Sequence, residues 1–513
     1  MQDNHIISIK KQVHETVELN NDYTLPDYIV DVRKLVSCDA RVVLQNVYGT
    51  ANSFSFEGEV NYSILVICED NSIKNLIYSE EFSLNGNGCG CEVSVHDCRL
   101  ESNVARLVSP RKLNCRSKIV VTTKNNIEES TDTRYCGLGM PEAEFTTERK
   151  MAKCGYLMFF DEKVQNQHAS RDIELTSTKD EIASIVYCRV NTYISERKVS
   201  DGKLFLRGET VAEILYENTN GNYIKHYDRV PFNDIIENSN GAGAHMCEIL
   251  ISDIKAAVRN NSFGEMKIIE LDYTYSIRCR FYIEKESEVV ADVYSTEYDV
   301  TCKCNSLAAM KLNSLFSSSL SVNDSCSTDE LADGDILEIV DHNATVVSVN
   351  IKPDPAKSRV IISGDLKFDI VYKAEEYGYL TVTRPYKYER EFECTGEDVY
   401  YEHCVNVQPI SCTIEKGRLL LNAELYFNVM IAAVSQYEYI QEAEFVGCNS
   451  ENNSPVIIYY PKKDDTLWQI AKKYKTTCKD IISANSLNSD SLDGIKVLLL
   501  PKKKKKSIYN AII

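Results

Sequence analysis

The sequence lacks the hydrophobic segments that would carry a chain into or across a membrane. None of its 513 residues belongs to an uninterrupted apolar run of about 18, the length that a transmembrane helix needs. The N-terminus is polar from Met1 to His5 and leads into Lys10 and Lys11, without the basic, apolar and small-residue order of a signal peptide. We therefore expect a protein without a transmembrane segment that stays in a cytoplasm.

The motifs of common enzyme classes are also missing. There is no Gly-x-x-x-x-Gly-Lys phosphate loop, no His-Glu-x-x-His metal motif and no Cys/His or paired-carboxylate signature in a family-like context. The 8 histidines are scattered, and the two C-x-C pairs among the 19 cysteines, Cys89/Cys91 and Cys302/Cys304, do not have the spacing of a zinc site. These patterns predict no enzyme activity, no cofactor and no metal, with reduced and mostly buried cysteines.

The charge is divided unevenly along the chain. The formal net charge is −19, but residues 454–513 contain 12 lysines and 5 aspartates, which leaves −26 for residues 1–453. An acidic body makes nucleic-acid binding a poor prediction. The lysine run 502–506 has two interpretations, a solvated tail or a segment that attracts an acidic partner or an anionic surface.

Residues 1–450 contain three copies of one alternating pattern. Apolar and polar residues alternate around a glycine that an acidic residue follows, at Gly58, Gly208 and Gly364. This period of two is typical of a half-buried strand, and a glycine inside it predicts a bulge or the close approach of a neighbouring backbone. A phenylalanine follows each glycine, and a segment with acidic residues closes each copy; these marks are Phe82, Phe232 and Phe392, and residues 141–145, 290–294 and 441–445.

The repeat period of about 150 residues is too long for a solenoid and predicts tandem domains. Several alternating strands per copy favour mainly β domains of the antiparallel sandwich or barrel type. We expect linkers over 140–181 and 303–335, the second serine-rich, and a short leading helix over 25–32 with Pro26 at its first position. The predicted domains are 1–140, 141–302 and 303–450, then a small module over 454–501 and a basic tail over 502–513.

The small C-terminal module has a βααβ pattern. An apolar strand over 456–460 precedes Thr466, which with Gln469 forms a predicted capping box for a helix over 467–474. A second capped helix follows Thr477, and an apolar strand over 497–500 ends at Pro501. Each helix places its apolar residues on one face, so two helices on a two-stranded sheet can form a small core.

The module resembles the LysM family, on the residues Asp465-Thr466-Leu467-Trp468, Ala484-Asn485, Leu487 and Pro501. The resemblance implies a shallow groove for N-acetylglucosamine polymers, between the loop after the first strand and the loop before the last. Two family glycines are replaced, by Asp464 and Ile495, and side chains there narrow such a groove. We therefore predict a protein-binding surface formed by Asp464, Asp465, Thr466, Trp468, Leu487 and Ile495. Trp468, the only tryptophan, lies off the core stripe and is either an interface anchor or a contact with the module's own loops.

Three tandem β-copies followed by one LysM module resemble the coat-type domain proteins of endospore-forming bacteria, in particular the SipL family of clostridial spore coat morphogenetic proteins. The resemblance implies a non-enzymatic scaffold in the mother-cell cytoplasm at the forespore surface. Its implied partner is stage IV sporulation protein A, the coat-basement ATPase, with other coat proteins as further candidates. The alternative is a peptidoglycan-binding wall or cortex protein, which would require export and an open groove.

Overall fold

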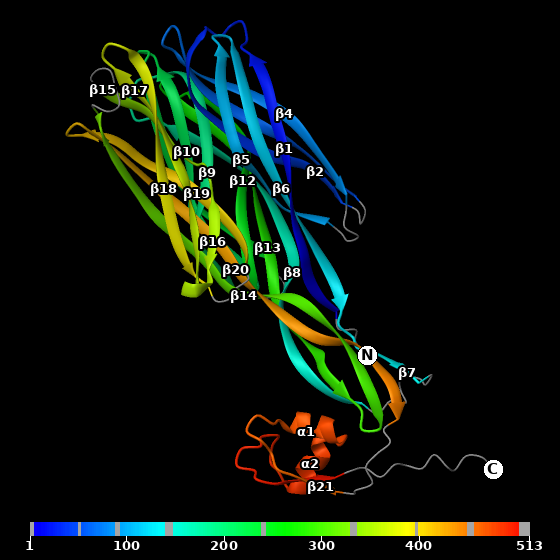
Figure 1. Ribbon diagram of the computed structural model, residues 1–513. Helices are drawn as coiled ribbons and strands as arrows, with labels where there is room; N and C mark the ends of the chain where they lie inside the picture. Colours follow the sequence, from blue (N-terminus) through cyan, green and yellow to red (C-terminus); the bar gives the residue numbers. More distant parts are fainter. Residues whose placement is uncertain are drawn as a thin grey trace.

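A computed structural model describes residues 5–49, 53–87, 93–138, 147–237, 243–328, 336–394, 399–448 and 456–501. The molecule is elongated: a broad body of strands narrows to a few long strands, and the two helices lie beyond their end (Figure 1). Cys89 and Cys91, the acidic segment 141–145 and the lysine run 502–506 lie outside the described residues.

Each copy forms two antiparallel sheets, so the predicted mainly β fold is confirmed. The first copy contains β1 (His5–Thr24), β6 (Lys112–Ser130) and β5 (Val93–Ser109), and β2 (Val32–Gly49), β3 (Ser53–Cys68) and β4 (Ile73–Asn87). The second contains β12 (Ala244–Asn260), β13 (Met266–Tyr294) and β8 (Glu148–Glu174), and β11 (Tyr223–Glu237), β10 (Lys203–Asn218) and β9 (Ile182–Ser200). The third contains β14 (Tyr298–Ser327), β20 (Arg418–Cys448) and β19 (Val399–Glu415), and β15 (Ile336–Val346), β17 (Arg359–Ala374), β16 (Asn350–Asp354) and β18 (Gly378–Glu393).

The two sheets of each copy enclose a hydrophobic core. Phe56 and Ile64 of β3 pack with Ile119 of β6 in the first copy, and Phe368 of β17 packs with Phe427 of β20 in the third. Because both sheets contribute their inward-facing residues, each copy is a β-sandwich.

The recurring glycines occur where a neighbouring backbone comes close, as predicted. A Cβ atom would lie 2.7 Å from Val43 O at Gly58, 1.8 Å from Tyr193 O at Gly208 and 2.0 Å from Ser348 O at Gly364. The pairing register shifts beside Gly58 and Gly208, which marks a bulge in the partner strand.

An aromatic ring lies opposite each of these glycines. Phe82 pairs with Gly58 and Phe232 with Gly208 in the antiparallel register. In the third copy Tyr388, and not Phe392, pairs with Gly364. Tyr388, like the other two rings, follows its glycine by 24 residues, and its hydroxyl donates to Ser348 O at 2.9 Å. Tyr388 therefore fills the space beside Gly364 and gives a hydrogen bond to the Ser348 carbonyl, which lies between β15 and β16.

The predicted linkers are in fact strands. Residues 148–174 form β8 and residues 298–327 form β14, each the first strand of its copy. The serine-rich segment alternates, with Ser317, Ser319 and Ser321 exposed while Leu320 and Val322 turn inward. The serines therefore occupy the outward positions of a strand, where their composition alone imitates a linker.

The predicted leading helix over 25–32 is also wrong, because these residues form a loop ahead of β2. Leu25 N and Val32 N donate to Arg111 O and Pro110 O in the β5–β6 turn. The Arg111 guanidinium donates to Pro26 O and Ile29 O and pairs with Asp31 at 2.9 Å. Partners distant in sequence thus satisfy backbone groups that would otherwise form a helix.

The three copies meet at a shared junction. Leu65, Leu215 and Val371 each follow their glycine by seven residues, and all three lie in one buried cluster with Tyr187, Tyr223 and Tyr379. The partners of these three residues on the adjacent strand are Ser37, Tyr187 and Asp341. Equivalent positions of the three copies therefore converge, but they carry different side chains.

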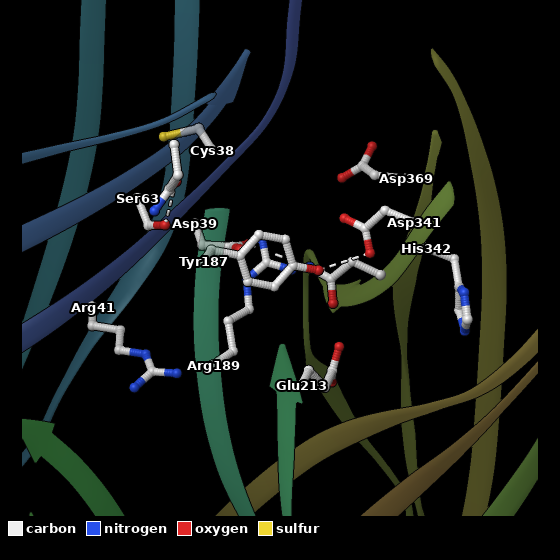
Figure 2. A network of polar contacts seen from close by, with 12 residues as sticks. Cys38, Asp39, Arg41, Ser63, Tyr187, Arg189, Glu213, Asp341, His342 and Asp369 are labelled. Carbon is white, nitrogen blue, oxygen red and sulfur yellow. Dashed lines mark hydrogen bonds and ion pairs between the residues drawn. The ribbon is translucent and has the colours of Figure 1, made fainter. Parts of the chain in front are cut away.

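The different side chains form a buried polar network beside this cluster (Figure 2). Lys225 Nζ of the second copy lies 2.7 Å from Asp341 Oδ1 of the third and 2.9 Å from Glu213 Oε2. Tyr187 OH donates to Asp341 Oδ1 at 2.7 Å, and Arg189 pairs with Asp39 of the first copy at 2.6 Å. The network thus links all three copies through ion pairs.

The charges of the network determine its ionisation. Burial alone would raise the pKa of Asp341, but Lys225 and Arg189 outweigh burial and hold the pKa below its ordinary value. Burial, with the nearby Lys225 ammonium, lowers the pKa of His342 to about 3. Its Nε2 lies 3.0 Å from Tyr227 OH, so His342 is a neutral imidazole at neutral pH.

Beyond the body, the long strands form a stalk (residues 148–158, 283–312 and 432–448). Its interior contains Cys154, Tyr156, Val289, Leu307 and Tyr439, and nearer the tip Val293, Ile440 and Phe445. The short strand β7 (Arg134–Gly137), which follows the first copy, pairs in parallel with residues 442–445 of β20. All three copies therefore contribute to the stalk, which projects toward the helices (Figure 1).

Replacing Gly208 with alanine is expected to destabilise the protein by roughly 1–3 kcal/mol, because the new methyl group meets the Tyr193 carbonyl and not a movable side chain. Gly155→Ala is the matched control, since a Cβ there has no heavy atom within 4 Å. Urea midpoints of the two variants and the parent chain measure the difference. Equal midpoints for Gly208→Ala and the parent would contradict the close approach.

Acidification is expected to destabilise the fold below about pH 6.5. The folded chain keeps His342 neutral while the unfolded chain takes up a proton, so stability is complete above pH 6.5 and decreases as the pH falls toward 3. The slope due to this residue is at most about 1.4 kcal/mol per pH unit. His342→Gln should reduce the slope of unfolding free energy against pH, whereas His168→Gln, exposed on β8, should not. An unchanged slope in His342→Gln would refute the assignment.

Candidate functional site: the terminal module and its contact with the stalk

The terminal module folds in the predicted order. It contains β21 (Val456–Tyr459), α1 (Leu467–Tyr474), α2 (Cys478–Asn485) and β22 (Leu498–Pro501), with β21 and β22 antiparallel. Thr466 Oγ1 accepts from Gln469 N, and the Gln469 side chain accepts from Thr466 N, which completes the predicted capping box. Thr477 Oγ1 likewise accepts from Asp480 N at the start of α2. Local sequence is sufficient to start both helices.

The loop after β21 is held by its own aspartate. Asp465 Oδ2 accepts from Tyr459 OH at 2.6 Å and from Lys462 N at 2.8 Å. These bonds lower the pKa of Asp465, chiefly through the backbone donor. Asp465 and Thr466 therefore stabilise the loop and the helix start, whereas Asp464 is exposed. Of these three predicted surface residues, Asp464 and Thr466 are exposed and Asp465 is partly buried.

The loop before β22 contributes Leu487 and Ile495, which are partly buried against the module's core. A turn in which Ile495 N donates to Leu492 O places Gly494 at φ +78°, with open space around its Cβ position. The turn glycine is thus present one residue before Ile495. Gly494 thus leaves its backbone without a side chain beside the partly buried side chain of Ile495.

Trp468 packs against the module's core and also contacts the stalk. Its Nε1 donates to Asp292 Oδ2 of β13 at 2.7 Å, and its ring meets Tyr294 edge to face at a centroid distance of 4.9 Å. Tyr294 is only 2% exposed and belongs to the same hydrophobic cluster as Leu467, Ile470 and Ile481. The hydrophobic core of the module therefore includes a residue of the second copy.

Charged groups surround this contact. Lys472 Nζ lies 2.6 Å from Asp292 Oδ1, and Lys475 Nζ lies 3.1 Å from Asp299 Oδ1 of β14. Tyr294 OH donates to Thr476 O at 2.7 Å. Burial raises the pKa of Asp292, but the bonds from Lys472 and Trp468 outweigh it and lower the pKa overall. Asp292 is therefore a carboxylate that accepts from two side chains of α1.

The outer face of the β21–β22 sheet is apolar and exposed. Ile457 and Tyr459 turn toward the core, so their neighbours turn outward. The outward residues are between 42% and 69% exposed: Val456, Ile458, Tyr460, Val497 and Leu499. Leu499 is therefore exposed although it belongs to the apolar strand predicted over 497–500. Both strands are uninterrupted apolar runs in the sequence, so no alternation of apolar and polar residues marks this face.

Family models match two parts of the chain. Residues 462–497 match the LysM domain, and residues 181–264 match the SipL, SPOCS domain. The second match spans β9 to β12 of the second copy and ends in the turn before β13. These matches confirm the predicted resemblance to a SipL-type protein with a C-terminal LysM domain. Searches of curated proteins and of solved structures gave no match.

Both matched domains are binding or adaptor types, and together they indicate a sporulation protein associated with the spore coat. Among the residues described here, no helix has the length and apolar character to cross a bilayer. Within the same residues, no three His, Cys, Asp or Glu side chains are grouped so that they could hold a metal ion.

Proposed function

We propose that this protein is a non-enzymatic scaffold of spore coat assembly that docks through its LysM module to stage IV sporulation protein A. Docking would take place in the mother-cell cytoplasm at the forespore surface and would help attach the coat. The observation that best supports a protein partner is the exposed apolar face of β21 and β22. Five large apolar side chains gathered on so small a sheet are typical of a protein-binding patch.

The predicted groove residues fit this proposal in part. Asp464 is exposed in the loop that continues from Tyr460, so a partner on the sheet face can extend to it. Asp465 and Thr466 are engaged in local hydrogen bonds, and Leu487 and Ile495 line the second loop. We propose that Asp464, Leu487 and Ile495 form the margin of the docking surface and that the sheet face forms its centre.

The charge around the sheet face favours an acidic partner. Lys462, Lys463 and Lys496 are exposed in the loops beside β21 and β22. A lysine rim around an apolar centre steers an acidic surface into contact and sets its orientation.

The alternative function is peptidoglycan binding, the general property of LysM modules. Gly494 supports it, because its positive φ and open surroundings leave one loop backbone accessible to a sugar. The aspartate side chains at 464 and 465 oppose it, since they occupy the other loop.

Ile458→Glu in the full chain should weaken binding to purified stage IV sporulation protein A at least tenfold, about 1.4 kcal/mol, because it places a charge at the centre of the apolar face. Val164→Glu on β8, also an exposed apolar residue, is the matched control and should bind like the parent. Binding is measured by titration calorimetry. Equal affinities for Ile458→Glu and the parent would overturn the proposed surface, and sedimentation of the parent with purified peptidoglycan, without binding to the protein partner, would favour the alternative.

A further inference from the structure

Asp292 is the centre of the contact between module and stalk. Its two carboxylate oxygens accept from two different residues of α1, Trp468 and Lys472. Asp292 also accepts from Val293 N at 2.9 Å, a bond that orients the carboxylate from within β13. Asp292 is thus oriented by its own strand and binds two donors of the module. It is therefore suited to setting the angle between the module and the stalk.

We propose that Asp292 is a positioning residue: it clamps the LysM module to the stalk so that the apolar β21–β22 face is held away from the repeats and open to a partner. The proposed orientation of the module rests on the intramolecular contacts alone. The proposed effect on partner affinity rests on the proposed function. Trp468 then contributes to docking through the stalk and not by touching the partner.

The geometry of the interface supports a fixed orientation. Three contacts lie along one side of the module, at Trp468 with Asp292, at Lys475 with Asp299 and at Thr476 with Tyr294. Three separated contacts define a plane, so the module cannot rotate without breaking at least one of them. In Figure 1, α1 is the helix nearest the stalk, and β21 lies at the far side of the module.

The interface also supplies what a small module lacks. A domain of about fifty residues buries a small share of its surface and is marginally stable alone. Tyr294 adds a nearly fully buried aromatic ring to the module's core, and its hydroxyl satisfies the Thr476 carbonyl. The stalk therefore stabilises the same element that it orients.

Trp468 is the only tryptophan in the chain, so its fluorescence reports on the clamp directly. In the full chain, Asp292→Ala should shift the emission maximum to longer wavelength and raise the acrylamide quenching constant about twofold, because the indole loses its acceptor and gains access to water. Asp292→Asn keeps an acceptor oxygen for Nε1 but removes the charge that holds Lys472, so its quenching should be intermediate. Asp253→Ala is the matched control, since Asp253 also pairs with a lysine, Lys255 at 2.9 Å, on β12.

Binding to purified stage IV sporulation protein A is measured on the same four proteins. We expect Asp292→Ala to bind several-fold more weakly than the parent, Asp292→Asn to be intermediate and Asp253→Ala to be unchanged. Unchanged quenching in Asp292→Ala would overturn the clamp itself. Increased quenching with equal or tighter binding would overturn the positioning role and would identify an inhibitory contact. If the parent itself does not bind, the proposed function fails while the quenching series still decides the clamp.

Discussion

The arrangement of the three copies depends on buried ion pairs at their junction. Lys225 is neutralised by Glu213 of its own copy and Asp341 of the next, and Arg189 by Asp39 of the first. A buried charge whose partner is removed costs about 3–5 kcal/mol. Because equivalent positions carry different side chains in each copy, exchanging two copies would leave charges unpaired. The network therefore favours one order of three otherwise similar sandwiches.

That order determines where the stalk and the module lie. β8 and β13 of the second copy and β14 and β20 of the third extend together beyond the body, and β7 connects the first copy to the same tip. The end of β13 carries Asp292 and Tyr294, and the start of β14 carries Asp299; all three contact the module. The junction with its buried charges is thus connected through the stalk strands to the module that carries the exposed apolar sheet.

The sequence predicted those features whose causes lie close together in the chain. The capping box at Thr466, the helix order of the module and the tight spaces at the recurring glycines all depend on neighbours within a few residues or on one adjacent strand. The leading helix was wrong because its backbone partners lie about eighty residues away at Arg111. The role of Trp468 could not be read from the module, since Asp292 is 176 residues distant. The serine-rich part of β14 was predicted as a linker because of its serine content, although exposed serines alternate there with inward-facing apolar residues.

The proposed docking surface has its centre on a sheet and not in the groove that the sequence predicted. The loop after β21 is occupied by Asp465 and its hydrogen bonds, and α1 is engaged with the stalk. The outer face of β21 and β22 combines exposed apolar side chains with a rim of lysines. Under the proposed function, this face at the end of the long stalk is the surface that a partner binds.

Hydrogen exchange of the full chain, with and without stage IV sporulation protein A, tests this account most directly. Slower exchange is expected across residues 456–460 and 497–501 on addition of the partner, with no change across 292–299 or 466–475. Protection confined to the three repeats, or loss of protection at the stalk contact when the partner binds, would contradict it.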